Sequence, residues 1–82
     1  MSNISVTVRY FALFRDMAGT AEATLTVPAQ TTGELFDTLA SQWAFSEPRT
    51  HCKVAVNDEL VDWQHSLVSG DTVLLFPPVA GG

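Results

Sequence analysis

The sequence predicts a small α+β domain in which one main helix packs against one face of a β-sheet. Three observations lead to this class. Several short segments alternate apolar and polar residues, as half-buried strands do. One longer segment in the middle of the chain has the apolar spacing of an amphipathic helix. The 82 residues leave room for one domain, so the strands and the helix must share a single core.

The first part of the chain predicts two strands with a short helix between them. Alternation over residues 4–10 indicates a half-buried strand. Residues 12–18 follow as a short helix, and Gly19 is the expected stop signal. Residues 23–27 alternate again and form the second strand, which Pro28 ends because proline has no N–H for the ladder.

The main helix is predicted from its start signal and its apolar face. Thr31 and Glu34 have the spacing of a capping box, in which each side chain bonds the other residue's free backbone N–H. The residues that follow repeat at helical spacing and place one continuous apolar stripe toward the sheet. That stripe consists of Leu35, Phe36, Leu39, Ala40 and Trp43.

The rest of the chain supplies the remaining strands and a tail. A loop is expected at residues 46–50, strands at 52–56, 60–61 and 72–76, and turns at 57–59 and 69–71. Pro77 and Pro78 must end the last strand, since neither can donate to a ladder. The predicted organisation is a domain over residues 1–76 and a flexible C-terminal tail over residues 77–82.

Composition excludes several classes of function. The net charge is −5 with only four Lys and Arg residues, so nucleic-acid binding is not expected. No signal peptide or membrane-spanning run is visible, and the one cysteine fits a reducing compartment; we expect a cytoplasmic protein. Hydrophobic residues make up 46% of the chain, more than a core of this size would hide. The excess suggests an apolar face for another protein.

The side chains offer little for chemistry of their own. His51, Cys52 and His65 are too few for a Cys/His metal site, so no metal is predicted. Cys52 lies in phase with the core-facing residues of its predicted strand, which favours a buried and inert thiol. Asp62, His65 and Ser66 are close in sequence, but a triad is recognised by its geometry. No phosphate-binding glycine loop is present, and no cofactor is expected on this chain.

The end of the chain is the unusual feature. After Phe76 the side chains shrink along Pro77, Pro78, Val79, Ala80, Gly81 and Gly82. A tapering segment suits a narrow channel, because glycine has no Cβ to meet the channel wall. These six residues span about 20 Å when extended, at roughly 3.3–3.6 Å each. The Gly82 carboxylate would then be the group delivered to a partner, and its activation would require an ATP-using enzyme.

The sequence resembles the sulfur carrier subunits of molybdopterin synthase. The similarity is carried by the tail from Phe76 to Gly82 and by residues 8–19, 54–57 and 69–73. It implies a ubiquitin-like β-grasp fold with a mixed sheet. It also implies a cycle in which a ubiquitin-activating-like enzyme adenylates Gly82 with ATP and a sulfur donor converts it to a thiocarboxylate. The large synthase subunit, in a heterotetramer with two copies of each chain, would then receive the tail and bind the pterin precursor.

The sheet face away from the main helix is the expected partner surface. Strand alternation directs Arg9, Phe11, Leu74 and Phe76 to that face, and the resemblance adds Arg15 at its rim. Three other readings stay open from the sequence. They are a sulfur carrier for thiamine synthesis, a ubiquitin-like protein modifier, and a β-grasp interaction module whose tail has no role.

Overall fold

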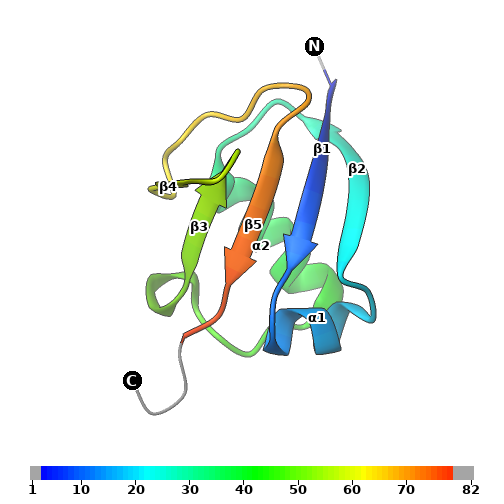
Figure 1. The fold of residues 1–82 in the computed structure, drawn as a ribbon, viewed down its shortest axis with the longest axis vertical. Coiled ribbons are helices and arrows are strands. Elements are labelled where there is room, and N and C mark those ends of the chain that lie inside the picture. Colours follow the sequence, from blue (N-terminus) through cyan, green and yellow to red (C-terminus); the bar gives the residue numbers. More distant parts are fainter. Residues whose placement is uncertain (1–2, 79–82) are drawn as a thin grey trace.

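A computed structural model describes residues 3–78 of the chain (Figure 1). The predicted order of strands and helices is confirmed. The elements are β1 (Asn3–Tyr10), α1 (Leu13–Ala18), β2 (Glu22–Pro28), α2 (Thr32–Trp43), the 3-10 turn η1 (Arg49–His51), β3 (Lys53–Val56), β4 (Glu59–Val61) and β5 (Thr72–Phe76).

The five strands form one mixed sheet in the order β2-β1-β5-β3-β4. The central strands β1 and β5 run parallel, and every other neighbouring pair is antiparallel. Helix α2 lies across one face of the sheet, and no helix of residues 3–78 covers the other face (Figure 1). β1 and β5 both run toward the end of the sheet where α1 lies. This is the β-grasp arrangement that the resemblance implied.

The start of α2 confirms the capping box. Thr31 Oγ1 accepts from the backbone N–H of Glu34 at 3.2 Å, and Glu34 Oε1 accepts from the backbone N–H of Thr31 at 2.9 Å. Two amide groups that a helix start leaves free are thereby bonded. The helix then buries Leu35, Phe36 and Leu39, and its other two predicted apolar residues are partly buried against the same core.

The core lies between α2 and the sheet. The central strands contribute their alternate residues, as predicted: Ile4, Val6, Val8, Val73 and Leu75. An aromatic cluster fills the end of the core where α1 packs on α2 and on the residues that follow it. Phe14 lies 4.4 Å from Phe45 and 5.8 Å from Phe36, measured between ring centroids. Such close aromatic packing anchors α1 against the end of α2.

Two local predictions are wrong. The stretch predicted as a loop at residues 46–50 ends in η1, whose first turn is closed by a bond from His51 N to Pro48 O at 2.9 Å. Cys52 was predicted as a residue of the third strand, but it is the residue that follows η1, and β3 begins at Lys53. Its burial is nevertheless confirmed.

No core residue was predicted in the segment from Asp62 to Gly70, yet this segment packs against the N-terminal end of α2. Leu67 is buried, and Trp63 packs edge-on against Phe36 with a centroid distance of 5.2 Å. Backbone bonds from Thr32 and Gly33 to carbonyls of this segment hold it against the helix start. Isolated apolar residues in a long connection have no periodicity, which is why the sequence pattern did not show them.

Candidate docking face and tail exit

The sheet face away from α2, called here the open face, carries an apolar strip. Strand register aligns Arg9 with Leu74, Leu74 with Ala55, and Ala55 with Leu60. Residues paired across neighbouring strands point to the same side of a sheet, so these four side chains form a row across the open face. Leu60 is 70% exposed and Leu74 is half-buried. The row therefore places large apolar groups where a partner chain would cover them.

A second row lies where β5 ends. Phe11, the residue after β1, stacks on Phe76, the last residue of β5, with ring centroids 4.8 Å apart and planes 17° from parallel. Next to the two rings is a groove of about 640 Å³ lined by Phe11, Ala12, Leu13, Glu47, Phe76, Pro77 and Pro78. The groove thus begins at the point where the chain leaves the sheet.

The cationic residues predicted for the partner surface lie apart from this groove. Arg9 is on the open face and forms an ion pair with Glu22, with Nε 3.5 Å from Oε2 and both side chains more than half exposed. An exposed pair of this kind contributes little to stability, so Arg9 stays available for other partners. Arg15 is exposed on α1, outside the residues that line the groove.

The remaining predicted tail residues, Val79, Ala80, Gly81 and Gly82, lie outside the described residues. Pro77 is half-buried and Pro78 is exposed, and both border the groove. β5 ends at Phe76, as the two prolines required. The prediction that Gly82 is the working group therefore stays a prediction.

The sequence interpretation missed Leu13, Ala55 and Leu60 as parts of this surface. Leu60 could have been found, because the two-residue turn at Asn57 and Asp58 sets the register of β3 and β4. Both turn residues have positive φ, at 53° and 70°, as the tight hairpin turn demands. Ala55 and Leu13 could not be found in this way, because their assignment depends on β3 pairing with β5 and on α1 lying near the end of β5.

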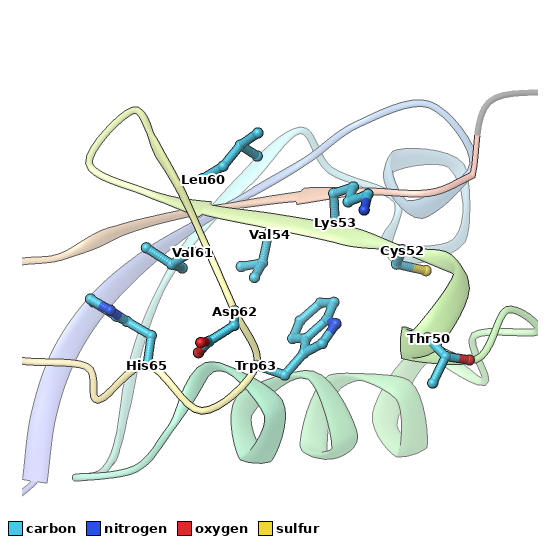
Figure 2. A pocket seen from close by; sticks show the side chains of 9 residues that line it. All are labelled: Thr50, Cys52, Lys53, Val54, Leu60, Val61, Asp62, Trp63 and His65. Atoms are coloured by element: carbon cyan, nitrogen blue, oxygen red, sulfur yellow. The ribbon is translucent and has the colours of Figure 1, made fainter.

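A second cavity lies beside β4, an edge strand of the sheet. Its volume is about 790 Å³, and it is lined by Thr50, Cys52, Lys53, Val54, Leu60, Val61, Asp62, Trp63 and His65. Figure 2 shows Trp63 and Val54 pointing toward each other across it, with Cys52 at one end.

Cys52 is not placed for sulfur chemistry. The thiol is buried and donates to the Pro48 carbonyl with Sγ 3.4 Å from the oxygen. Burial raises the pKa of the Cys52 thiol, and the negative charge of Glu47 raises it further. A thiol that resists ionisation is a poor nucleophile, as the sequence predicted.

The polar residues near this cavity do not assemble into a recognised site. The Asp62 carboxylate accepts from the backbone N–H of Gln64 at 3.0 Å, and the described hydrogen bonds include none joining His65 to Ser66. Within residues 3–78, no three His, Cys, Asp or Glu side chains lie close enough to hold a metal ion. No helix in this same range is both long enough and apolar enough to cross a membrane.

Comparison with known proteins gives the chain its relatives. The model of the ThiS family matches residues 8–82. The molybdopterin synthase sulfur carrier subunit of Escherichia coli is 35% identical over 80 residues, covering 94% of this chain and 99% of the relative. The protein of the same name in Drosophila melanogaster is 31% identical and covers 96% and 92% of the two chains.

Solved structures agree with the fold and the family. SAMP1 from Haloferax volcanii superposes with a TM-score of 0.79 at 28% identity, covering 95% of this chain and 99% of that one. A second match is a chain in the complex of subunits 1 and 2 of molybdopterin-converting factor from Helicobacter pylori. It is 31% identical with a TM-score of 0.64, and the match covers 96% of this chain and 100% of that one. A ubiquitin from Caldiarchaeum subterraneum, 14% identical with a TM-score of 0.68 and coverage of 99% and 100%, shows the ubiquitin-like fold alone.

The family model and the curated relatives span nearly the whole chain, and the strand order and main helix are those of ubiquitin-like β-grasp proteins. The chain therefore belongs to the ThiS family, together with the sulfur carrier subunits of molybdopterin synthase.

Proposed function

We propose that this chain is a sulfur carrier for molybdenum cofactor synthesis and acts as the small subunit of a molybdopterin synthase. The observation that carries the proposal is the likeness to relatives of that name over nearly their whole length. The geometry agrees with it. β5 runs without a spacer into the tapering segment from Pro77 to Gly82, beside an apolar open face.

The proposed chemistry uses the Gly82 carboxylate alone. A carboxylate oxygen attacks the α-phosphorus of ATP on an adenylating partner, pyrophosphate leaves, and an acyl-adenylate forms. A donor that supplies sulfur at the oxidation level of sulfide then attacks the carbonyl carbon and displaces AMP. The product is a thiocarboxylate, whose sulfur is a better nucleophile than the original oxygen. Conversion through a mixed anhydride is needed because a free carboxylate does not exchange its oxygen at neutral pH.

Transfer would take place in the large subunit. There the thiocarboxylate sulfur attacks an electrophilic carbon of the cyclic pterin precursor that carries an oxygen substituent. The C–S bond forms as the C–O bond of that carbon breaks, the oxygen leaves with the electron pair and takes up a proton, and the precursor is joined to Gly82 as a thioester. Water then cleaves the thioester, which leaves the thiolate on the product and returns the carboxylate. Two such transfers supply the two sulfur atoms of the dithiolene. The chain is thus the sulfur-donating subunit of the enzyme and has no separate activity of its own.

The open face would dock the large subunit. Phe11, Leu74 and Phe76 would supply apolar contact area, Arg9 would add a cation on the same face, and Arg15 would lie at the rim. The Helicobacter pylori structure holds subunits 1 and 2 of molybdopterin-converting factor in one complex, which supports a partner of this kind. A heterotetramer with two copies of each chain is the assembly proposed.

Charge supports this division of labour between the subunits. The chain has a net charge of −5, and two of its four cations, Arg9 and Arg49, already face carboxylates at 3.5 and 3.3 Å. A phosphate-bearing precursor requires clustered cations or amide donors. Those groups are therefore assigned to the large subunit, and the tail residues to the channel that leads to them.

Mass spectrometry tests the proposal directly. The purified chain is incubated with the adenylating partner, ATP and a sulfide donor, and then with the large subunit and precursor. We expect one oxygen to be exchanged for sulfur, and the exchange to be reversed as product forms.

Two tail variants are the matched controls. Removal of Gly82 draws the carboxylate back by roughly one residue length, about 3.5 Å, and one added residue converts it to an amide. Both variants should bind the large subunit within roughly tenfold of the parent and support no product. Substantial transfer by either would refute the role of Gly82.

A protein modifier is the second candidate, because the Haloferax volcanii SAMP1 structure, which matches with a TM-score of 0.79, is that of a protein named small archaeal modifier protein 1. The same experiment in cells separates the two. A modifier would appear as a ladder of conjugates joined through Gly82 to lysines. A carrier for thiamine synthesis would also become a thiocarboxylate, but it would give no product with the large subunit.

A further inference from the structure

The connection between β1 and α1 is a strained turn. Phe14 N donates to the Phe11 carbonyl at 3.0 Å, which closes a four-residue turn around Ala12 and Leu13. Ala12 has φ 50° and ψ −122°. The first central position of such a turn normally holds glycine, because a Cβ is unfavourable at this φ. A strained residue persists where its surroundings over-determine the conformation.

Two aromatic side chains hold this turn from opposite sides of the sheet. Phe14 is fully buried and packs in the core against Phe36 and Phe45. Phe11 lies on the open face and stacks on Phe76. The direction of the Phe11 ring is thus determined by a turn that the core itself keeps in place.

The Phe11–Phe76 stack is the contact that joins β1 to the end of β5. The described pairing of these two strands ends at Tyr10 and Leu75, one residue earlier on each. On its other side Phe76 is still paired with Lys53 of β3. The stack therefore takes the place of a further ladder pair on the β1 side, at the last residue before Pro77.

We infer that Phe11 is a positioning residue for sulfur transfer, which determines the direction in which the chain leaves β5. This inference rests on the proposed function. If the six residues after Phe76 lie extended in the channel of the large subunit, they span about 20 Å, and a change of about 10° in their direction at Phe76 would displace the far end by about 3.5 Å. Misplacement of a reacting group by 1 Å is enough to reduce a rate by about 100-fold. Pro77 and Pro78 restrict the direction at the start of this segment, because the φ of proline is fixed.

The test separates positioning from simple contact area. Phe11→Ala, Phe11→Leu and Phe11→Tyr are prepared as thiocarboxylates. For each, the Kd for the large subunit and the single-turnover rate of sulfur transfer at saturating large subunit are measured. Val68→Ala is the control, because Val68 is 61% exposed and lies on neither the groove nor the strip.

We expect the saturated transfer rate to fall by about 10- to 100-fold in Phe11→Leu and Phe11→Ala. Phe11→Tyr keeps the stacking ring and should stay within about threefold of the parent, as should Val68→Ala. A residue that supplied only apolar area would change Kd and leave the saturated rate unaltered. A parent-like saturated rate for Phe11→Leu and Phe11→Ala would overturn the inference. If the parent itself transferred no sulfur, the proposed function would be what had failed.

Discussion

A polar network around the buried Asp71 carboxylate ties the β3–β4 turn to the start of β5, and the exchange of Asp71 with Asn57 is our most detailed prediction. The Asp71 carboxylate, 6% exposed, accepts from Asn57 Nδ2 and from the backbone N–H of Val68, each at 2.9 Å. Asn57 Oδ1 accepts from the N–H of Thr72 at 3.0 Å, and the Asn57 N–H donates to the Thr72 carbonyl at 2.9 Å. The network holds β5 in the register that directs Phe76 to the open face.

Asp71→Asn breaks this arrangement by replacing one acceptor with a donor. The new NH₂ group must face either Asn57 Nδ2 or the Val68 N–H, so one bond to a charged group is lost and two donors oppose each other. A bond to a charged group contributes about 1.5–3 kcal/mol, and an unsatisfied buried group costs about 1–3 kcal/mol. Since the two estimates overlap, we expect the free energy of unfolding to fall by about 2–4 kcal/mol. For a domain of this size that lowers Tm by roughly 10–30 °C.

The reciprocal exchange should restore the stability. Asn57→Asp alone places two carboxylates against each other and is also destabilising. In the double variant Asn57→Asp with Asp71→Asn, the new carboxylate accepts from Thr72 N and from the new amide, whose oxygen accepts from Val68 N. All three bonds are thereby recovered. Aspartate also tolerates the positive φ of 53° at position 57.

Urea denaturation followed by circular dichroism gives the four free energies of this cycle. We expect the double variant to lie within about 1 kcal/mol of the parent, with a coupling energy of about 2 kcal/mol or more. Asp58→Asn is the control, because Asp58 is exposed on the same turn and should change stability by less than about 0.5 kcal/mol. A double variant as unstable as the sum of the two single variants would refute the reasoning.

Four further predictions concern single side chains. Phe76→Ala should weaken large-subunit binding by at least tenfold in titration calorimetry while leaving the circular dichroism spectrum unchanged; unaltered affinity would remove Phe76 from the interface. Cys52→Ala should keep full sulfur transfer and lose about 1–2 kcal/mol of stability, and loss of transfer in a folded variant would contradict the buried-thiol assignment. Gly33→Ala should lower the free energy of unfolding by about 1–3 kcal/mol, because the added Cβ would lie 2.8 Å from the Trp63 carbonyl oxygen. This cost exceeds the preference of a helix for alanine over glycine, about 1 kcal/mol, and a stabilised variant would show that the contact relaxes. Tyr10→Phe should change stability by less than about 1 kcal/mol in denaturation, because the buried hydroxyl meets the Trp43 side chain without forming a hydrogen bond of good geometry; a larger loss would show that the contact with Trp43 is a strong hydrogen bond.

Local patterns were enough to predict most of the fold. The alternation in residues 4–10 and 72–76 gave the core side of β1 and β5, because the side-chain period of a strand is two. The spacing of Thr31 and Glu34 gave the start of α2, because a capping box bonds groups only three residues apart. The patterns failed at residues 62–70, where Leu67 and Trp63 are buried by contacts with α2 and not by any repeat of their own.

The sequence by itself predicted the group that the proposed chemistry uses. One inert thiol, few cations, and a segment that tapers to Gly82 leave the last carboxylate as the candidate group, and all of these are properties of composition and order. Only the tertiary structure decided what surrounds Phe76, where the chain leaves the sheet. Phe11 and Phe76 are far apart in the chain and meet because β1 and β5 run parallel side by side, a pairing that needs the helix-covered core to hold it. Leu60 and Ala55 join the same face through the register of two more strands. The turn at Asn57 and Asp58 sets the pairing of β3 with β4, but no local signal in the sequence could specify the pairing of β3 with β5 across the sheet.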